Sequence, residues 1–170
     1  MNKILLFFLI SVNCFSQSNL PQLLKKHNTE SVPYITVSEL QKEKTFDSDK
    51  GNSIVLLDAR EPKEFEISHL KNAVCVGYDF FNLENTLQKL PKDKNTKIVV
   101  YCSLGIRSED IAEQLQKAGY TNIFNLYGGI FEWKNQGKTV VNLENKSTEK
   151  IHTFNKEWSK WLHKGEKIYE

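Results

Sequence analysis

The chain has 170 residues, enough for one ordinary domain that buries a hydrophobic core without a metal or a disulfide framework. Its 23 lysine and arginine residues nearly balance its 21 aspartate and glutamate residues, which gives a formal net charge of +2. This balance, without any block of like charges, argues against the basic surface of nucleic-acid-binding or membrane-surface proteins.

The first residues have the pattern of a secretory signal peptide. Lys3 precedes an apolar run over residues 4–12, which is too short to span a bilayer comfortably. Ser16 is small, so we expect a signal peptide over residues 1–16 with cleavage before Gln17. The protein is then expected to be periplasmic or secreted, with no membrane span after cleavage.

Two alternatives remain for this N-terminus. One is an uncleaved anchor. The other is a lipid on Cys14, which we disfavour because the preceding Asn13 is larger than the residue that lipoprotein signals usually carry there. Residues 17–31 form an N-terminal segment, within which Leu20 to Lys26 are a candidate helix.

From residue 32, strand-like and helix-like segments alternate along the chain. The predicted strands cover residues 34–37, 53–58, 73–76, 97–101 and 122–126. The first predicted helix starts after Ser38 as N-cap, and the second covers about 63–67 after Pro62. The third covers 79–90, with four apolar residues on one face: Phe80, Leu83, Leu87 and Leu90. The fourth covers 108–118 before Gly119, and the fifth follows Gly128-Gly129. This alternation predicts an α/β domain over residues 32–141, with a central, mostly parallel sheet flanked by helices on both faces.

Residues 142–170 form a C-terminal extension that we expect to be helical. Apolar residues recur there at helical spacing: Ile151, Phe154, Trp158, Trp161 and Leu162. We expect this helix to pack on the domain rather than to bind a partner or a membrane surface, because its polar face carries both charge signs.

Two cysteines remain after signal cleavage, too few for a disulfide framework. They could pair outside the cytoplasm, where disulfides persist, or one could be buried and the other reactive. Cys75 lies within an apolar run and reads as a core residue, with a resolving-thiol role as the alternative. Cys102 instead follows a predicted strand and precedes a short loop and a helix.

The loop after Cys102 is suited to holding an anion. Ligands of parallel sheets bind beyond the carboxyl ends of the strands, where Asp58 and Cys102 both stand. A free thiol is mostly protonated at neutral pH, but a helix N-terminus, inward amides of a glycine-containing loop and the cation of Arg107 stabilise a thiolate. We therefore predict Cys102 as a nucleophile rather than a buried core cysteine. The loop residues expected to bind substrate are Ser103, Leu104, Gly105, Ile106, Arg107 and Ser108.

Two chemistries use a cysteine in such a loop. Tyrosine-phosphatase-type enzymes have a loop one residue longer, which fits a phosphoryl group. Here four residues, Ser103 to Ile106, separate the cysteine from Arg107. This shorter loop is better sized for a persulfide sulfur.

Several motifs in order now identify a resemblance. The chain resembles the rhodanese family, specifically small single-domain sulfurtransferases exported from the bacterial cytoplasm, over about residues 35–141. The matching segments are LLDAREPKEF at 56–65, SHLKNA at 68–73, YCSLGIRS at 101–108, Gly119-Tyr120, and Tyr127-Gly128-Gly129 with Trp133.

The resemblance implies transfer of a sulfane sulfur through a Cys102 persulfide, from thiosulfate or a similar anion to a thiol acceptor or an acceptor protein, by ping-pong kinetics. It implies no metal and no organic cofactor. Ser103 departs from the family pattern, because thiosulfate-using relatives often carry a cation there. The alternatives are a non-enzymatic persulfide carrier or partner-binding module, and a cysteine-dependent phosphatase or arsenate reductase.

The supporting residues have simpler structural interpretations. Asp58 could orient the loop, and Arg60 is expected to pair with Glu64 or Glu61, in an ion pair that we interpret as structural. His69 reads as a turn histidine that bonds to backbone. Phe131 and Trp133 read as packing residues, with a substrate-rim role as an alternative for Phe131.

Overall fold

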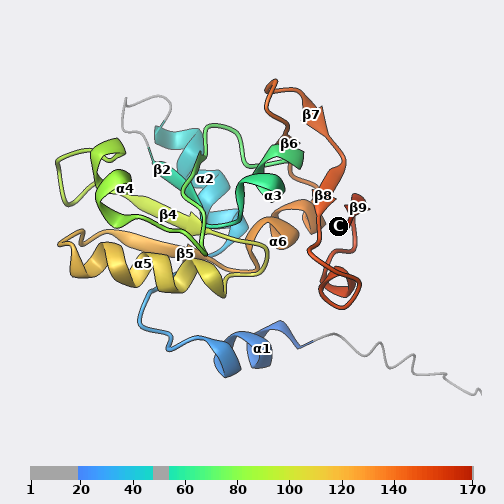
Figure 1. Ribbon diagram of the computed structural model, residues 1–170, viewed down its shortest axis with the longest axis horizontal. Helices are drawn as coiled ribbons and strands as arrows, with labels where there is room; N and C mark the ends of the chain where they lie inside the picture. Colours follow the sequence, from blue (N-terminus) through green and yellow to red (C-terminus); the bar gives the residue numbers. More distant parts are fainter. Residues whose placement is uncertain (1–18, 48–53, 170) are drawn as a thin grey trace, which may run out of the picture.

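The computed structural model describes residues 19–47 and 54–169 (Figure 1). The predicted signal peptide and Cys14 lie outside these residues, so export stays a prediction of the sequence. Within the described part, no helix is both long and apolar enough to cross a membrane.

A five-stranded sheet forms the centre of the molecule. Its strands are β1 (Tyr34–Ile35), β2 (Val55–Asp58), β3 (Val74–Cys75), β4 (Ile98–Tyr101) and β5 (Ile123–Leu126). They lie in the order β1-β5-β4-β2-β3, and every pair is parallel. The predicted parallel sheet is therefore confirmed, and the apolar runs of β2 and β4 are buried because helices cover both faces.

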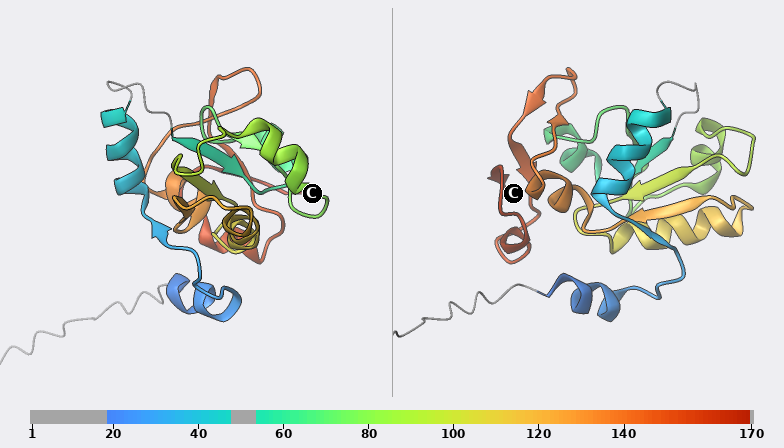
Figure 2. Two further views of the ribbon diagram at one scale, coloured as in Figure 1. Left: turned by 90° about the vertical axis from the view of Figure 1, so that its left-hand side faces the viewer. Right: turned by 180° about the vertical axis from the view of Figure 1, so that it is seen from behind.

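The two faces carry different helices (Figures 1 and 2). Side chains alternate along β4: Val99 and Tyr101 belong to one apolar cluster, Ile98 and Val100 to the other. The first cluster includes residues of α2 (Val37–Asp47) and α6 (Gly129–Asn135). The second includes residues of α4 (Leu83–Lys89) and α5 (Arg107–Lys117). A further helix, α3 (Pro62–Ile67), follows β2.

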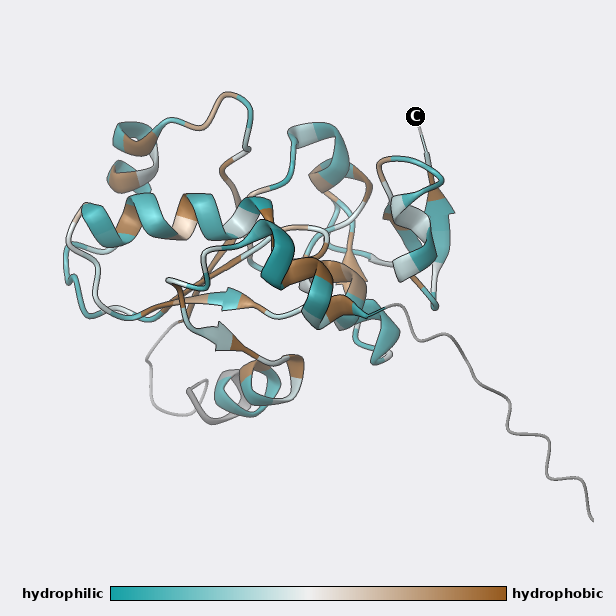
Figure 3. Ribbon diagram, turned by 90° about the horizontal axis from the view of Figure 1, so that it is seen from below, coloured by the Kyte–Doolittle hydropathy of each residue, from teal (hydrophilic) through white to brown (hydrophobic). Residues whose placement is uncertain are grey.

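The N-terminal segment contains α1 (Leu20–His27), close to the expected helix. Asn19 caps it, since its side chain accepts a hydrogen bond from the Gln22 amide at 3.2 Å. Figure 3, in which the ribbon is coloured by hydropathy, shows that hydrophilic and hydrophobic residues alternate along this helix. Leu24 is buried, and Leu20 and Leu23 pack against the core, so α1 is attached to the body by its leucines.

Two predicted helix starts were wrong. Helix α2 begins at Val37, because Thr36 rather than Ser38 caps it: the Thr36 hydroxyl accepts from the Glu39 amide, and the Glu39 carboxylate accepts from the Thr36 amide. Helix α4 begins at Leu83 rather than near residue 79, because the Asn82 side chain caps it.

Phe80 therefore lies before helix α4 and outside its apolar face. Its side chain is 94% exposed, although its spacing from Leu83 and Leu87 suggested a buried position.

The C-terminal extension is not a helix. It contains β7 (Ser147–Thr148), paired with β6 (Val140–Val141), and β8 (Lys150–His152), paired with β9 (Glu166–Ile168). A short 3₁₀ helix, η1 (Trp158–Trp161), lies between β8 and β9. The predicted packing still occurs, since Ile151, Trp161 and Leu162 are buried in the core. Phe154, with φ of 63°, breaks the chain direction where a helix would have continued.

Candidate active site

Cys102 follows β4 directly and lies at the carboxyl edge of the sheet. It is only 2% exposed, but it lines a pocket of about 330 Å³ that opens above this edge. Asp58 ends the neighbouring strand β2, opposite Tyr101. The cysteine is thus placed where the topology predicts a ligand site.

Helix α6 holds the first half of the loop. The Ile130 amide donates to the Cys102 carbonyl at 2.9 Å, and the Phe131 amide donates to the Ser103 carbonyl at 3.2 Å. This approach requires Gly129, because a Cβ there would lie 2.3 Å from the Cys102 carbonyl oxygen. The first helical turn of α6 therefore draws two loop carbonyls away from the thiol.

Gly105 completes the turn. Its φ of +105° favours glycine, and its amide donates to the Cys102 sulfur at 3.2 Å. Its carbonyl points away and accepts from two side-chain amides, Asn125 Nδ2 and Asn28 Nδ2, each at 2.8 Å. The two asparagines therefore hold the Gly105–Ile106 peptide, which directly follows the residue whose amide donates to the sulfur.

The pKa of the Cys102 thiol is lowered. Burial opposes ionisation, but the charge of Arg107 and hydrogen bonds from Ser108 and from the Gly105 amide outweigh it. The Ser108 hydroxyl lies 3.5 Å from the sulfur and 2.7 Å from Asn125 Oδ1, so its single proton has two possible acceptors. Such a thiol forms the nucleophilic thiolate more readily than an ordinary cysteine.

Arg107 is bound by a carboxylate. Its Nη1 donates to Glu64 Oε2 at 2.7 Å and its Nη2 donates to Glu64 Oε1 at 2.9 Å, a bidentate pair. Glu64, on α3, is fully buried; burial opposes its charge, but Arg107 and then Arg60 hold its pKa below the ordinary value. His152 of β8 is also buried, with Nδ1 at 3.9 Å from Glu64 Oε1.

The expected partner of Arg60 was wrong. Arg60 pairs with Asp58, Nη2 to Oδ2 at 2.7 Å, and both side chains are fully buried. Arg60 Nη2 also donates to the Ser68 carbonyl at 2.6 Å. The pair connects the end of β2 to the chain that follows α3, which is a structural role. Glu64 pairs with Arg107 instead of Arg60.

The remaining candidates lie apart from the thiol. The His69 ring bonds through Nδ1 to the Phe65 carbonyl at 3.0 Å, as predicted for a turn histidine. Cys75 is a half-buried free thiol whose pKa is raised by burial. Phe131 is buried in the core, which excludes a rim role, and Trp133 is buried and donates to the Thr139 carbonyl at 2.9 Å.

No sequence pattern pointed to Glu64 as the partner of Arg107 or to the two asparagines as partners of Gly105. Asn28 is 77 residues from the glycine that it contacts, and Asn125 lies within a buried strand. The contacts of both asparagines with Gly105 form only when the chain folds, because these residues are far apart in sequence. Among the described residues, no group of three or more histidine, cysteine, aspartate or glutamate side chains is placed to hold a metal ion.

The pocket above Cys102 has walls from several parts of the chain. The active loop contributes Ser103, Leu104, Ile106 and Arg107; the segment after β2 contributes Glu61 and Lys63; and the segment before α4 contributes Tyr78 and Asp79. His27, at the end of α1, and Phe154 and Trp158, in the C-terminal extension, complete the lining.

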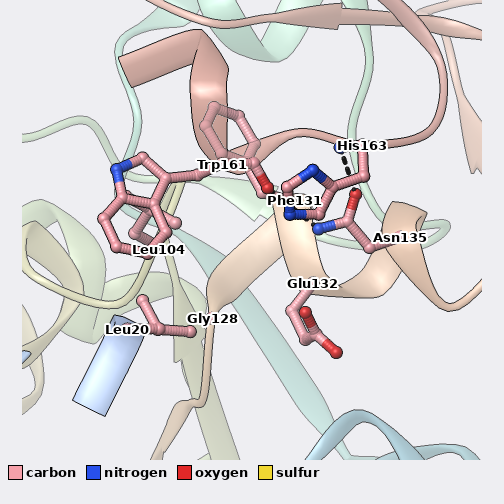
Figure 4. Close-up of a pocket in the computed structure, with 8 residues that line it drawn as sticks. All are labelled: Leu20, Leu104, Gly128, Phe131, Glu132, Asn135, Trp161 and His163. Atoms are coloured by element: carbon pink, nitrogen blue, oxygen red, sulfur yellow. Dashed lines mark hydrogen bonds between the residues drawn. The ribbon is translucent and has the colours of Figure 1, made fainter. Parts of the chain in front are cut away.

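A second, smaller pocket of about 100 Å³ lies between Leu20 and helix α6 (Figure 4). Cys102 does not line it. Its Asn135 side chain accepts from the His163 amide at 2.7 Å and donates to the Trp161 carbonyl at 2.9 Å. These bonds attach the C-terminal extension to α6, so this pocket is part of the structural joint between them.

Comparison with known proteins matches residues 36–136 to the Rhodanese-like domain family. Over 88 residues the chain is 35% identical to the probable adenylyltransferase/sulfurtransferase MoeZ of Mycobacterium tuberculosis, covering 52% of this chain and 22% of that protein. Over 86 residues it is 35% identical to the tRNA uridine(34) hydroxylase of Erwinia tasmaniensis, covering 49% of this chain and 25% of that protein.

A solved structure has the same fold. The rhodanese-related protein from Thermoplasma volcanium matches with a TM-score of 0.53 and 28% identity, over 64% of this chain and 97% of that one. By contrast, the chain matches about a quarter of the length of the two curated relatives. The shared part contains the cysteine loop, whereas His27, Phe154 and Trp158 lie outside residues 36–136.

Proposed function

Because the chain belongs to the rhodanese-like domain family, we propose that it is a sulfurtransferase that carries a sulfane sulfur on Cys102. One observation carries this proposal: the Cys102 sulfur lines a pocket and accepts a hydrogen bond from the Gly105 amide at 3.2 Å, and the pKa of the Cys102 thiol is lowered. The name of the MoeZ relative also includes a sulfurtransferase activity.

The first half-reaction loads the cysteine. The Cys102 thiolate attacks the outer sulfur of a donor such as thiosulfate, the sulfur–sulfur bond of the donor breaks, and sulfite leaves with the bonding electron pair. The product is a Cys102 persulfide anion. The Gly105 amide and Ser108, which already donate to the sulfur, stabilise this anion, and hydrogen bonds from α6, Asn28 and Asn125 to three loop carbonyls hold the loop in shape.

The second half-reaction transfers the sulfur from the Cys102 persulfide to an acceptor. A thiolate or cyanide acceptor attacks the terminal sulfur of the persulfide, and Cys102 leaves as a thiolate, ready for the next donor. The enzyme alternates between two stable forms, so the kinetics are ping-pong.

The geometry favours sulfur transfer over phosphoryl transfer. A phosphatase needs its loop arginine to bind phosphoryl oxygens in the bidentate manner. Here both terminal nitrogens of Arg107 already donate to Glu64, and Nη2 also donates to the Ser103 hydroxyl at 3.3 Å. We therefore expect no hydrolysis of an aryl phosphate.

The direct test measures thiocyanate formed from thiosulfate and cyanide. Wild type and Cys75→Ser are expected to form it, and Cys102→Ser is expected to be inactive, because Cys102 is the one of the two described cysteines that lies in the loop with Gly105. Mass spectrometry after exposure to donor is expected to show one added sulfur on the Cys102 peptide, lost on addition of a thiol acceptor.

Two results would contradict the enzymatic proposal. Activity that survives Cys102→Ser would move the nucleophile elsewhere. A sulfur that is gained on Cys102 but is passed to no small acceptor would identify a carrier that serves a dedicated partner protein.

A further inference from the structure

The pocket above Cys102 is completed by residues outside the segment that is shared with the family. Phe154 and Trp158 come from the C-terminal extension, and His27 comes from the end of α1. The two ends of the chain therefore shape the space that a substrate enters, while the shared segment provides the nucleophile.

The C-terminal wall is apolar and aromatic. Phe154 is 49% exposed and has a φ of 63°, a conformation that is rare for a bulky residue. Trp158 packs partly against the core and is held by its amide, which donates to Asn155 Oδ1 at 3.0 Å. With Leu104 and Ile106 of the loop, these rings give the pocket an apolar side.

The charges around the pocket cancel. Lys63 and Arg107 line it together with Glu61 and Asp79, and the buried Glu64 further neutralises Arg107. A small dianion such as thiosulfate therefore meets no excess of positive charge among these lining side chains. The pocket volume of about 330 Å³ falls instead in the range of sites for small organic ligands.

We propose that the sulfur donor of this protein is a monoanionic organic sulfane-sulfur compound whose apolar substituent packs against Phe154 and Trp158. Organic persulfides and thiosulfonates share this chemistry. The inference rests on the proposed sulfurtransferase function and names the class of donor for the same cysteine.

The reaction balances for a thiosulfonate. The Cys102 thiolate attacks the terminal sulfur of R–SO₂–S⁻, the sulfur–sulfur bond breaks, and R–SO₂⁻ leaves with the electron pair, which gives a Cys102 persulfide anion. Total charge is the same before and after. With an organic persulfide the leaving group is the thiolate R–S⁻.

Three donors test the effect of donor charge and the effect of the apolar substituent separately. Thiosulfate is a small dianion, methanethiosulfonate is a small monoanion, and benzenethiosulfonate is a monoanion with an aromatic ring. With cyanide as acceptor, kcat/KM is expected to be at least about tenfold higher for benzenethiosulfonate than for methanethiosulfonate, because an apolar pocket discriminates by this order or more. Thiosulfate is expected to give the lowest value.

Variants of Phe154 and Trp158 test whether these two side chains cause the preference for the aromatic donor. Trp158→Ala and Phe154→Ala are each expected to reduce the benzenethiosulfonate to methanethiosulfonate ratio of kcat/KM several-fold. Leu143→Ala is the matched control, since Leu143 is also an exposed apolar residue of the extension, 59% exposed, but does not line the pocket. It is expected to change none of the three rates. Phe154 is half-exposed, so its variant keeps the test valid if Trp158→Ala fails to fold.

The outcomes distinguish this inference from the function on which it rests. If no donor places a sulfur on Cys102, the sulfurtransferase proposal fails. If thiosulfate is used as well as benzenethiosulfonate, or if both wall variants keep the wild-type ratio, the donor class is wrong while the function stands.

Discussion

At the residue scale, the chemistry depends on a buried sulfur that is nevertheless acidic. Burial alone would raise the pKa of Cys102, as it does for Cys75, but Arg107, Ser108 and the Gly105 amide reverse the direction. The cysteine, glycine and arginine were predictable because they are neighbours in sequence. Glu64, which holds Arg107, was not, because nothing local distinguishes it from Glu61.

Replacing Ser108 by alanine is expected to raise the pKa of Cys102. The substitution removes a hydroxyl that stabilises the thiolate, so less thiolate is present at neutral pH. The pH at which alkylation by iodoacetamide is half-maximal is expected to move upward. Sulfur transfer at neutral pH is expected to fall roughly three- to tenfold, since a hydrogen bond contributes about 1 kcal/mol.

Ser31→Ala is the control for this shift. Its hydroxyl also donates a hydrogen bond, to Glu113 at 2.6 Å, but on the exposed side of α5. An alkylation profile that is the same for Ser108→Ala and wild type would show that Ser108 donates to Asn125 alone.

At the element scale, the active loop is shaped by its neighbours rather than by its own residues. Helix α6 supplies two amides from its first turn, β5 supplies Asn125, and the chain after α1 supplies Asn28. The sequence predicted the helix after Gly128-Gly129 but not its contact with the loop. Such contacts follow from how closely two elements approach, which periodicity does not encode.

Gly129→Ala is expected to disrupt the loop. The added Cβ would lie 2.3 Å from the Cys102 carbonyl oxygen and 2.7 Å from the Ser103 carbonyl carbon, so either the loop or α6 must move. Activity is expected to fall at least about a hundredfold, because a displacement of about 1 Å can cost that much. Steady-state sulfur transfer and thermal unfolding together measure the effect.

Gly119→Ala provides a matched comparison. Gly119 also has a positive φ, +95°, but a Cβ there meets no atom within 4 Å. We expect a loss of about 1–2 kcal/mol in stability from the backbone conformation and unchanged activity. Equal activity losses in the two variants would mean that the close approach of α6 is not what shapes the loop.

At the scale of the whole molecule, the sequence predicted the sheet and its helices but not the extension. Strand-like segments that alternate with amphipathic helical segments are typical of a parallel sheet covered by helices. The tail had an equally regular apolar spacing, yet Ile151 lies in a strand and Trp161 in a 3₁₀ turn. Spacing alone could not reveal the reversal at Phe154 that brings both residues onto the core.

Ile151→Ala is expected to destabilise the fold by about 2–5 kcal/mol, since Ile151 is fully buried in the main apolar cluster. Leu143→Ala, in the same extension but exposed, is expected to stay within about 0.5 kcal/mol of wild type. Urea denaturation measures both. An Ile151→Ala variant as stable as Leu143→Ala would indicate that the extension does not contribute to the core.

The asparagine bond to the Gly105 carbonyl also matters for protein engineering. A recombinant fragment trimmed to residues 36–136 keeps Cys102, Gly105 and Arg107 but loses Asn28, one of the two amides on that carbonyl. In such a fragment the loop around Cys102 is less constrained, and the pocket lacks His27, Phe154 and Trp158. Conversely, exchanging tails between relatives offers a route to new substrate preferences without touching the catalytic turn.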